Sequence, residues 1–158
     1  MLPNTSSRLL SVVVVVRNAA EALEETLHSV RAVADEIVVV DTGSTDATCQ
    51  VAQRYGVKLL HRAWDDDFSA ARNFTADHAS GRWLLWLDAG ERLALASAQA
   101  LRAWLETNRA EKLVYLATVT LPRPQAHIGA EQAGQLRLVP NGAELRFTGR
   151  VRESLLPA

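Results

Sequence analysis

The stretch LLSVVVVVRNAAEALEETLHSVRAVADEIVVVD, residues 9–41, decides the fold. Its run Val12–Val16 is β-branched throughout, which is typical of a strand covered on both faces, as in parallel sheets. Asn18 can then cap a helix with Glu21 reaching back from the third helical position, and apolar residues follow at helical spacing. A second apolar strand follows at 36–40. The stretch therefore predicts a strand–helix–strand unit.

The same pattern continues along the chain. Residues 43–46 have the composition of a turn and a helix start, and apolar residues then recur every four positions up to Tyr55. Gly56 is well placed to end that helix, and residues 57–60 read as a third strand. The order strand–helix–strand–helix–strand favours a parallel α/β sheet.

The remaining residues extend this sheet and add an antiparallel part. We expect a loop at 61–67, a helix begun by Ser69, a strand at 83–87, a helix at 93–108, a strand at 113–121, a loop at 122–135 and a hairpin over 136–147 with its turn at Asn141 and Gly142. In that hairpin Arg137 alternates with two leucines, which places it on the opposite face from them. The predicted fold class is α/β: a Rossmann-like, mainly parallel sheet flanked by helices, with a C-terminal β-hairpin, in one domain spanning 1–158.

Composition narrows the function classes. A formal net charge of -1 gives no chain-wide attraction to nucleic acid or anionic membranes, so we expect no nucleic-acid partner. The longest early apolar run, 9–16, is far shorter than the roughly 20 residues of a membrane helix. The single cysteine, Cys49, excludes an internal disulfide and suits a reducing cytoplasm, where we expect the protein. We expect Cys49 to pack as a small hydrophobe, and the histidines show no metal-ligand spacing.

Three apolar strands end in an ionisable residue: Arg17, Asp41 and Asp88. In open parallel sheets the carboxyl ends of the strands face the ligand crevice, and an isolated charge is costly to bury. These residues therefore predict one shared, partly solvated cleft. The alternative is that each residue simply ends its strand in solvent.

Two further features favour an anionic ligand in that cleft. Residues 43–45 lead into a helix N-terminus, whose free N–H groups and partial positive charge favour phosphate. Arg72 falls in the first turn of a predicted helix, where the helix dipole disfavours a cation. It therefore needs a partner, either an anionic ligand or a salt bridge with Asp66 or Asp67.

Asp88 also raises the question of a metal ion. In an extended chain, acids at positions 88 and 90 would point to the same side and jointly hold a hard cation such as Mg²⁺ or Mn²⁺. Position 90 is a glycine, so half of that clamp is missing.

Four segments together carry a resemblance to a known family. They are EIVVVDTGSTD (36–46), WDDDFSAARN (64–73), WLLWLDAGE (83–91) and FTGRVRE (147–153). These resemble the motifs EIVVVDTGSTD, W-x-DDFS-x-ARN, W-x-LWLDADE and FTGRVHE of a bacterial branch of the family-2 glycosyltransferases, which have a GT-A nucleotide-sugar-binding fold. The matches span most of the chain in the family's order, and as a set they are highly specific.

The resemblance implies roles for particular residues. The donor-binding set would be Val16, Arg17, Asp41, Asp67, Arg72 and Arg152. Val16 and Arg17 would line the nucleotide base, and Asp41 would contact the base or ribose of a UDP-type donor. Asp67, or Asp66 beside it, would orient Arg72 or a donor hydroxyl. Asp88 matches the first acid of the family's DxD metal motif and, with Glu153 as the candidate base, forms the catalytic pair.

Two departures from the family pattern weaken the case for a metal. Gly90 replaces the second acid of the DxD motif, and Arg152 replaces a histidine similar to a third metal ligand. Glu91 is the alternative ligand beside Asp88, because a glycine at 90 relaxes the backbone. Arg152 would place a positive charge where the cation's charge is normally needed, and could steady the leaving diphosphate. A divalent cation, Mn²⁺ or Mg²⁺, is therefore a doubtful cofactor.

The resemblance implies an enzyme, a hexosyltransferase-type glycosyltransferase that moves a sugar from a nucleotide-diphosphate donor to an unknown acceptor, a glycan, lipid or protein. It also implies inversion at the sugar. Because the chain is short for the family, we expect the acceptor-side region to be missing or to lie in another domain. The alternative is a degenerate, non-catalytic module that binds a nucleotide or a partner protein, as Gly90 and Arg152 would allow.

Overall fold

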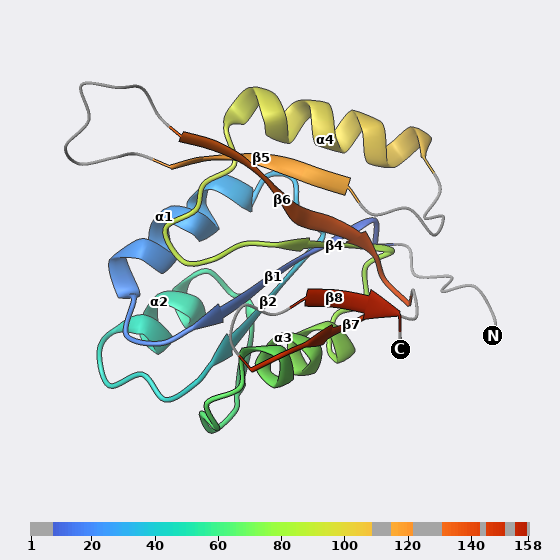
Figure 1. The fold of residues 1–158 in the computed structure, drawn as a ribbon. Helices are drawn as coiled ribbons and strands as arrows, with labels where there is room; N and C mark the ends of the chain where they lie inside the picture. Colours follow the sequence, from blue (N-terminus) through green and yellow to red (C-terminus); the bar gives the residue numbers. More distant parts are fainter. Residues whose placement is uncertain (1–7, 109–114, 122–130, 143–144, 151–153, 158) are drawn as a thin grey trace.

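The computed structural model describes residues 8–108, 115–121, 131–142, 145–150 and 154–157. The elements run in the order β1 (Leu10–Val16), α1 (Ala20–Val30), β2 (Glu36–Asp41), α2 (Thr48–Arg54), β3 (Lys58–His61), α3 (Phe68–Asp77), β4 (Trp83–Trp86), α4 (Leu95–Thr107), β5 (Tyr115–Leu121), β6 (Glu131–Pro140), β7 (Leu145–Thr148) and β8 (Ser154–Pro157) (Figure 1). None of the helices in these ranges is long and apolar enough to cross a membrane.

A six-stranded sheet forms the centre, in the order β3-β2-β1-β4-β6-β5. Strands β1 to β4 pair in parallel, while β6 runs antiparallel to both β4 and β5. This confirms the predicted α/β class with a mainly parallel sheet and antiparallel strands toward the C-terminus. The valine run is buried as predicted except for Val15, which is half-buried, because β1 lies in the middle of the sheet with helices on both faces.

A C-terminal antiparallel pair is present, formed by β5 and β6, but the two strands expected to pair with each other over 136–147 have other partners. Residues Asn141 and Gly142 do form a turn, but the strands on either side belong to different sheets. Strand β6 pairs with β4 and β5, whereas β7 pairs with β8 in a separate two-stranded sheet. Residues 131–135, expected in a loop, are the first half of β6. A turn signal therefore identified the turn but not the partners of its strands.

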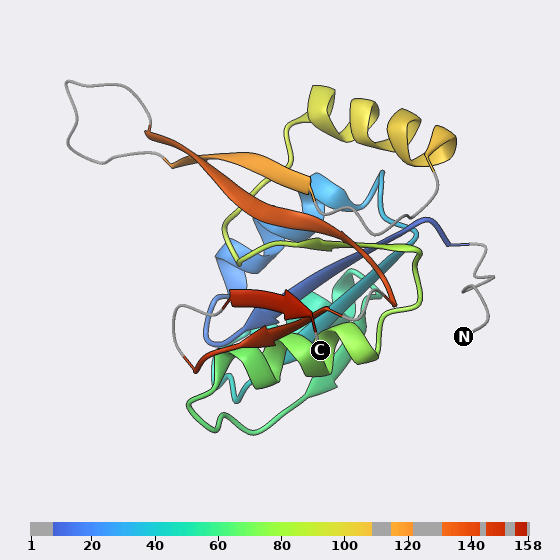
Figure 2. The same cartoon turned by 45° about the vertical axis from the view of Figure 1, so that its right-hand side comes forward.

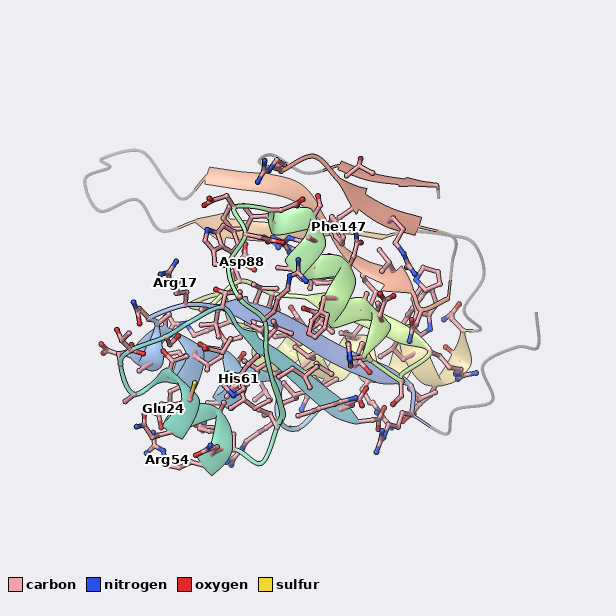
Figure 3. All side chains as sticks on the ribbon, turned by 90° about the horizontal axis from the view of Figure 1, so that it is seen from below. Arg17, Glu24, Arg54, His61, Asp88 and Phe147 are labelled. Carbon is pink, nitrogen blue, oxygen red and sulfur yellow. The ribbon has the colours of Figure 1, made fainter. Side chains whose placement is uncertain are left out.

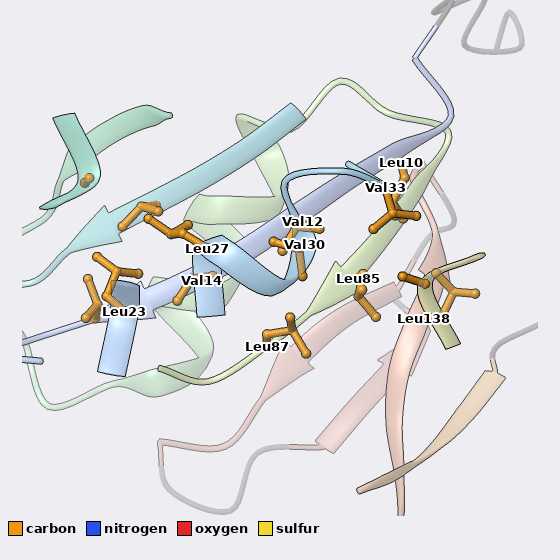
Figure 4. Close-up of a cluster of buried hydrophobic side chains, with 14 of the residues drawn as sticks. Leu10, Val12, Val14, Leu23, Leu27, Val30, Val33, Leu85, Leu87 and Leu138 are labelled. Atoms are coloured by element: carbon orange, nitrogen blue, oxygen red, sulfur yellow. The ribbon is translucent and has the colours of Figure 1, made fainter. Parts of the chain in front are cut away.

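The two faces of the sheet have different coverings. Helices α1, α2 and α4 cover one face, where even-numbered residues of β1 pack against Leu23, Leu27 and Leu105 (Figure 4). Helix α3 and the β7–β8 sheet lie over the other face, around Val13 and Trp86 (Figure 2). Each fully buried side chain of this kind contributes about 1.5–3 kcal/mol. Alternate side chains of β1 thus pack against the helices on one face of the sheet and against α3 and the β7–β8 sheet on the other.

The helix starts differ from the sequence expectations. The N-terminus of α1 has no side-chain cap of its own, and its Ala19 and Ala20 N–H groups donate to Thr48 and Asp46. Asn18, expected to cap α1, has a φ of 48° and instead accepts a hydrogen bond from the Thr45 N–H. These contacts tie the loop after β1 to the loop after β2 at the carboxyl edge of the sheet.

Candidate functional site

The strand ends that carry Arg17, Asp41 and Asp88 lie at the same edge of the sheet. Strands β2, β1 and β4 are neighbours, and Val16 pairs in register with Asp41. Arg17 is exposed directly beyond β1, and Figure 3 shows it beyond the same strand ends as Asp88 and His61. Val16 itself is buried among core residues. Val16 is therefore part of the core behind this edge of the sheet, and Arg17 faces solvent in front of it.

A cluster of alternating charges lies beside β4. An Nη2 atom of Arg72 is 3.1 Å from one carboxylate oxygen of Asp88, and Nη2 of Arg137 is 3.5 Å from the other. The same Arg137 nitrogen is 2.6 Å from Oε1 of Glu91. The residues come from α3, β6 and the loop after β4, and we call them the Arg–acid cluster: Arg72, Asp88, Glu91 and Arg137. Two guanidinium groups therefore bracket the acid that the sequence marks as central.

Arg72 is held in a partly apolar environment. Its side chain is 15% exposed, and its guanidinium carbon lies 5.6 Å from the Trp86 ring centroid and 5.4 Å from that of Phe147. The low exposure of Arg72 strengthens its attraction to the rings, whereas the Asp88 side chain is 54% exposed, so solvent partly screens the ion pair. Of the partners anticipated from sequence, Asp67 caps α3 by accepting from the Ala70 N–H, and Asp66 accepts from the Trp64 indole.

Arg137 was not anticipated as a site residue. It is 6% exposed, which is unusual for an arginine. The register between β5 and β6 pairs Tyr115 with Leu138 and Leu116 with Leu136, so Arg137 is the extra residue of a β-bulge. Strand β6 pairs with β4 through Leu138 and Leu85, so Arg137 lies beside the end of β4. This pairing brings the guanidinium to Asp88 and Glu91.

The conformation of the loop after β4 explains why position 90, two residues after Asp88, is a glycine. Gly90 has a φ of 96°, a conformation that residues with a side chain rarely adopt. Its N–H lies 3.1 Å from the Ala22 carbonyl and 2.9 Å from the Thr26 hydroxyl of α1, so the turn is fastened to the helix. Oε2 of Glu91 accepts from the Asp88 N–H at 2.8 Å. An aspartate at position 90 would strain this turn.

Asp41 has separate contacts at the end of β2. Its carboxylate accepts from the N–H groups of Gly43 and Ser44, and its Oδ2 is 3.6 Å from Nδ1 of His61. Burial opposes ionisation of Asp41, but the hydrogen bonds from Ser44 and Gly43 outweigh it and lower the pKa of this carboxyl. Burial, and then the Asp41 carboxylate, raise the pKa of the Cys49 thiol. Asp41 is therefore an anion at neutral pH, held by the turn that follows it.

Two of the recognised motifs are joined by direct contacts. The Asn73 side chain donates to the Phe147 carbonyl and accepts from the Phe147 N–H, both at 2.9 Å. The Ser69 hydroxyl donates to the Gly149 carbonyl at 2.6 Å, and the Phe68 N–H donates to the Arg150 carbonyl. The start of α3 and residues 147–150 thus form one unit. Ser69, expected to cap α3, has this docking role instead, while Arg152 and Glu153 lie outside the described residues.

The residues around Asp88 do not fit a divalent cation. Both oxygens of Asp88 face a guanidinium group, and Glu91 is tied to Arg137 and to the Asp88 N–H. A hard cation needs several oxygen ligands, and two adjacent guanidinium groups would repel it. Glu91 therefore acts as an ion-pair partner of Arg137 and not as a metal ligand. Gly90 has no side chain that could coordinate a metal ion.

Taken together, the fold and the edge define a class of protein. A doubly covered, mainly parallel sheet carries charged groups at the carboxyl ends of adjacent strands, which is where open α/β sheets bind nucleotides and related ligands. The family model of glycosyl transferase family 2 matches residues 11–115. The chain belongs to this family.

The chain is also similar to individual proteins. A TPR repeat-containing protein of Synechococcus elongatus is 41% identical over 139 residues, which is 87% of this chain and 33% of that protein. S. aureus TarS in complex with UDP has a TM-score of 0.52 and 26% identity over 62% of this chain and 32% of its own. The mannosyltransferase PcManGT from Pyrobaculum calidifontis, with GDP-Man and Mn²⁺, has a TM-score of 0.53 and 25% identity over 65% and 33%. The chain thus spans about a third of the length of these relatives.

Proposed function

We propose that this domain binds a nucleotide-diphosphate sugar of the UDP type at the carboxyl edge of the sheet and transfers its sugar to an acceptor. The single observation that carries the proposal is the Arg–acid cluster, because it presents two guanidinium groups beside the family's central acid. The UDP in the TarS complex and the GDP-Man in the PcManGT complex support a nucleotide donor for this chain as well.

The proposed donor lies along the strand tips. Arg17 and Asp41, at the ends of β1 and β2, would face the nucleoside, with Val16 in the wall behind them. Asp41 would enter as a carboxylate that accepts hydrogen bonds from the base or ribose, since its pKa is lowered. Arg72 would contact the diphosphate, and Asp67 would act by capping the helix that carries Arg72.

Asp88 has a positioning role in this proposal. Its carboxylate holds Arg72 and Arg137 in fixed directions, so that positive charge is already arranged before the donor binds. The two arginines, together with Arg152 of the matched motif, would then stabilise the negative charge on the leaving diphosphate. The proposed steps involve no metal ion, because the residues around Asp88 do not fit one.

The reaction proposed is a displacement at the anomeric carbon. An acceptor hydroxyl oxygen forms a bond to that carbon while the bond to the diphosphate oxygen breaks, with inversion. The hydroxyl proton passes to a base, for which Glu153 is the candidate, and the electron pair leaves with the nucleoside diphosphate. Preorganised positive charge at the leaving group lowers the barrier of such a step.

The proposal is tested by titrating the protein with UDP in the presence of EDTA and measuring the affinity by calorimetry. We expect wild-type protein to bind UDP without added metal and Arg72→Met to bind at least tenfold more weakly, about 1.4 kcal/mol. Arg54→Met is the matched control. Arg54 of α2 forms an exposed ion pair with Glu24 of α1, away from Asp88 (Figure 3). Equal affinities for wild type and Arg72→Met would contradict the placement of the diphosphate.

A second candidate is the degenerate module that binds the nucleotide or a partner protein without transfer. The observation that favours it is that Asp88 and Glu91 both form ion pairs with Arg137, so neither carboxylate is available as a metal ligand. UDP-sugar hydrolysis separates the two functions. Release of UDP from a UDP-sugar at a rate abolished by Asp88→Asn supports the transferase, whereas UDP binding with no release supports the module.

A further inference from the structure

Three side chains with metal-binding atoms meet at the end of β2, outside the Arg–acid cluster. They are Asp41 at the end of β2, Cys49 in the first turn of α2 and His61 at the end of β3. One ligand atom from each lies within 4.8 Å of the other two. No sequence motif links positions 41, 49 and 61, and the fold alone brings them together.

The backbone holds these residues in a favourable arrangement. Asp41 and His61 are register partners in adjacent parallel strands, so their separation is fixed by the sheet. Nδ1 of His61 is 3.6 Å from Oδ2 of Asp41. Tetrahedral zinc, with bonds of about 2.0–2.3 Å, places its ligand atoms about 3.3–3.8 Å apart. Small side-chain rotations would therefore bring all three atoms to coordination distance.

The surroundings of Asp41 resemble those of a positioned ligand. The N–H groups of Gly43 and Ser44 orient the carboxylate, and a carboxylate has further lone pairs to offer. Such outer hydrogen bonds are common around metal ligands. His61 has a side chain that is 66% exposed, which gives an ion access from solvent.

We propose that Asp41, Cys49 and His61 form a binding site for a zinc-type transition-metal ion, with one coordination position left to water. A thiolate, an imidazole and a carboxylate are the ligands that zinc prefers, whereas magnesium and manganese prefer oxygen alone. The carboxylate and the thiolate together carry two negative charges, which match the charge of the ion. The site is thus distinct in place and chemistry from a DxD site.

The position of this site has a consequence for the donor, which rests on the proposed function. If Asp41 contacts the nucleoside, zinc at Asp41 and UDP exclude one another. Zinc would then act as an inhibitor of donor binding at the nucleoside end of the edge.

The test uses Co²⁺ as a spectroscopic substitute for Zn²⁺. Zn²⁺ is then added to displace the bound Co²⁺. Because Cys49 is the one cysteine of the chain, a thiolate-to-cobalt charge-transfer band reports this site alone. We expect a band that saturates at one ion per chain and disappears on addition of Zn²⁺. It should be lost in Cys49→Ser, and the affinity should fall at least tenfold in His61→Gln. His28→Gln, which alters an exposed histidine of α1, is the control and should match wild type.

Other results would overturn the site. They are no thiolate band in the folded wild-type protein, one ion per two chains, or an unchanged affinity in His61→Gln. Thermal unfolding of each variant without metal shows whether it is folded. A separate titration of UDP in saturating Zn²⁺ tests the consequence for the donor. Cobalt bands without competition would retain the metal site and contradict the placement of the nucleoside at Asp41.

Discussion

The guanidinium of Arg137 lies 2.6 Å from a carboxylate oxygen of Glu91, although the two residues are 46 positions apart in the chain. Their side chains are 7% and 20% exposed, so the pair is largely removed from water. The pair links the central antiparallel strand β6 to the loop that carries Asp88. That loop is therefore fixed from two sides, by β6 and by the hydrogen bonds of Gly90 to α1.

Arg137→Met should destabilise the protein by about 2 to 3 kcal/mol, because it leaves the Glu91 carboxylate without its partner in a poorly solvated place. Urea unfolding measures the change in the free energy of unfolding. Arg146→Met is the control, since the Arg146–Asp77 pair is exposed and should contribute less than about 1 kcal/mol. Equal losses in the two variants would show that burial of the Arg137 pair has no energetic consequence.

The sequence predicted the parallel half of the fold well. Strong β-branched runs and helix signals alternate there, and β1, β2, β3 and β4 all lie where apolar runs predicted strands. The antiparallel half was predicted less well, because pairing over long sequence separations is not encoded in local pattern. The turn at Asn141 and Gly142 was confirmed, yet it joins two sheets rather than the strands of one hairpin.

The site shows the same division. Asp41, Asp88 and Arg72 were proposed from strand ends, helix position and motif, which are local signals, and the structure joins Arg72 to Asp88. Arg137 was not proposed, because local pattern did not predict that β6 pairs with β4 and so lies beside Asp88. His61 was set aside because the histidines show no metal-ligand spacing, and Cys49 was expected to pack as a small hydrophobe. The register of β2 with β3 is what brings His61 to Asp41.

Asn73→Ala should loosen the docking of β7 on α3. The Asn73 amide satisfies both the N–H and the carbonyl of Phe147, and their loss should cost about 1 to 3 kcal/mol. Amide hydrogen exchange should increase in β7 while β1 remains protected. Asn73→Asp should show the same change, because a carboxylate cannot donate to the Phe147 carbonyl. The exposed amide of Gln53 provides a control, and its replacement by alanine should change neither measurement.

Restoring the family's second acid should not restore a metal site. Gly90→Asp places a side chain on a residue with a φ of 96°, which should cost about 1 to 2 kcal/mol. Gly90→Asn should cost a similar amount, and Gly90→Ala at least as much, because asparagine and aspartate tolerate positive φ better than alanine does. The added Cβ meets only Ala22 at an ordinary 3.7 Å, so the cost comes from the backbone and not from a clash.

UDP titrations of the Gly90→Asp variant, with and without Mn²⁺, complete this test. We expect Mn²⁺ to leave the affinity unchanged, because Arg72 and Arg137 still hold Asp88. A gain in affinity that requires both the new aspartate and Mn²⁺ would mean that the arginines yield to a cation, and would return the metal to the mechanism.

Glu36 should make the stability of the protein sensitive to acid. Burial opposes ionisation of this carboxyl, but hydrogen bonds from Ser11 and Ser80 and the charge of Arg8 outweigh it and lower the pKa below its ordinary 4.5. The stabilisation is therefore fully present above about pH 4.5 and is lost as the pH falls through the lower, folded-state pKa.

Glu36→Gln should consequently lower the free energy of unfolding by about 1 to 2 kcal/mol at pH 7, and by less at pH 3, where the wild-type carboxyl also begins to protonate. Urea unfolding of both proteins at the two pH values measures this difference. Glu24→Gln is the matched control, because the Glu24–Arg54 pair is exposed and should change stability little at either pH. If the Glu36→Gln difference were the same at pH 7 and pH 3, the hydrogen bonds to Glu36 would not depend on its charge. The amino end of β2 would then be held by contacts that a neutral amide makes equally well.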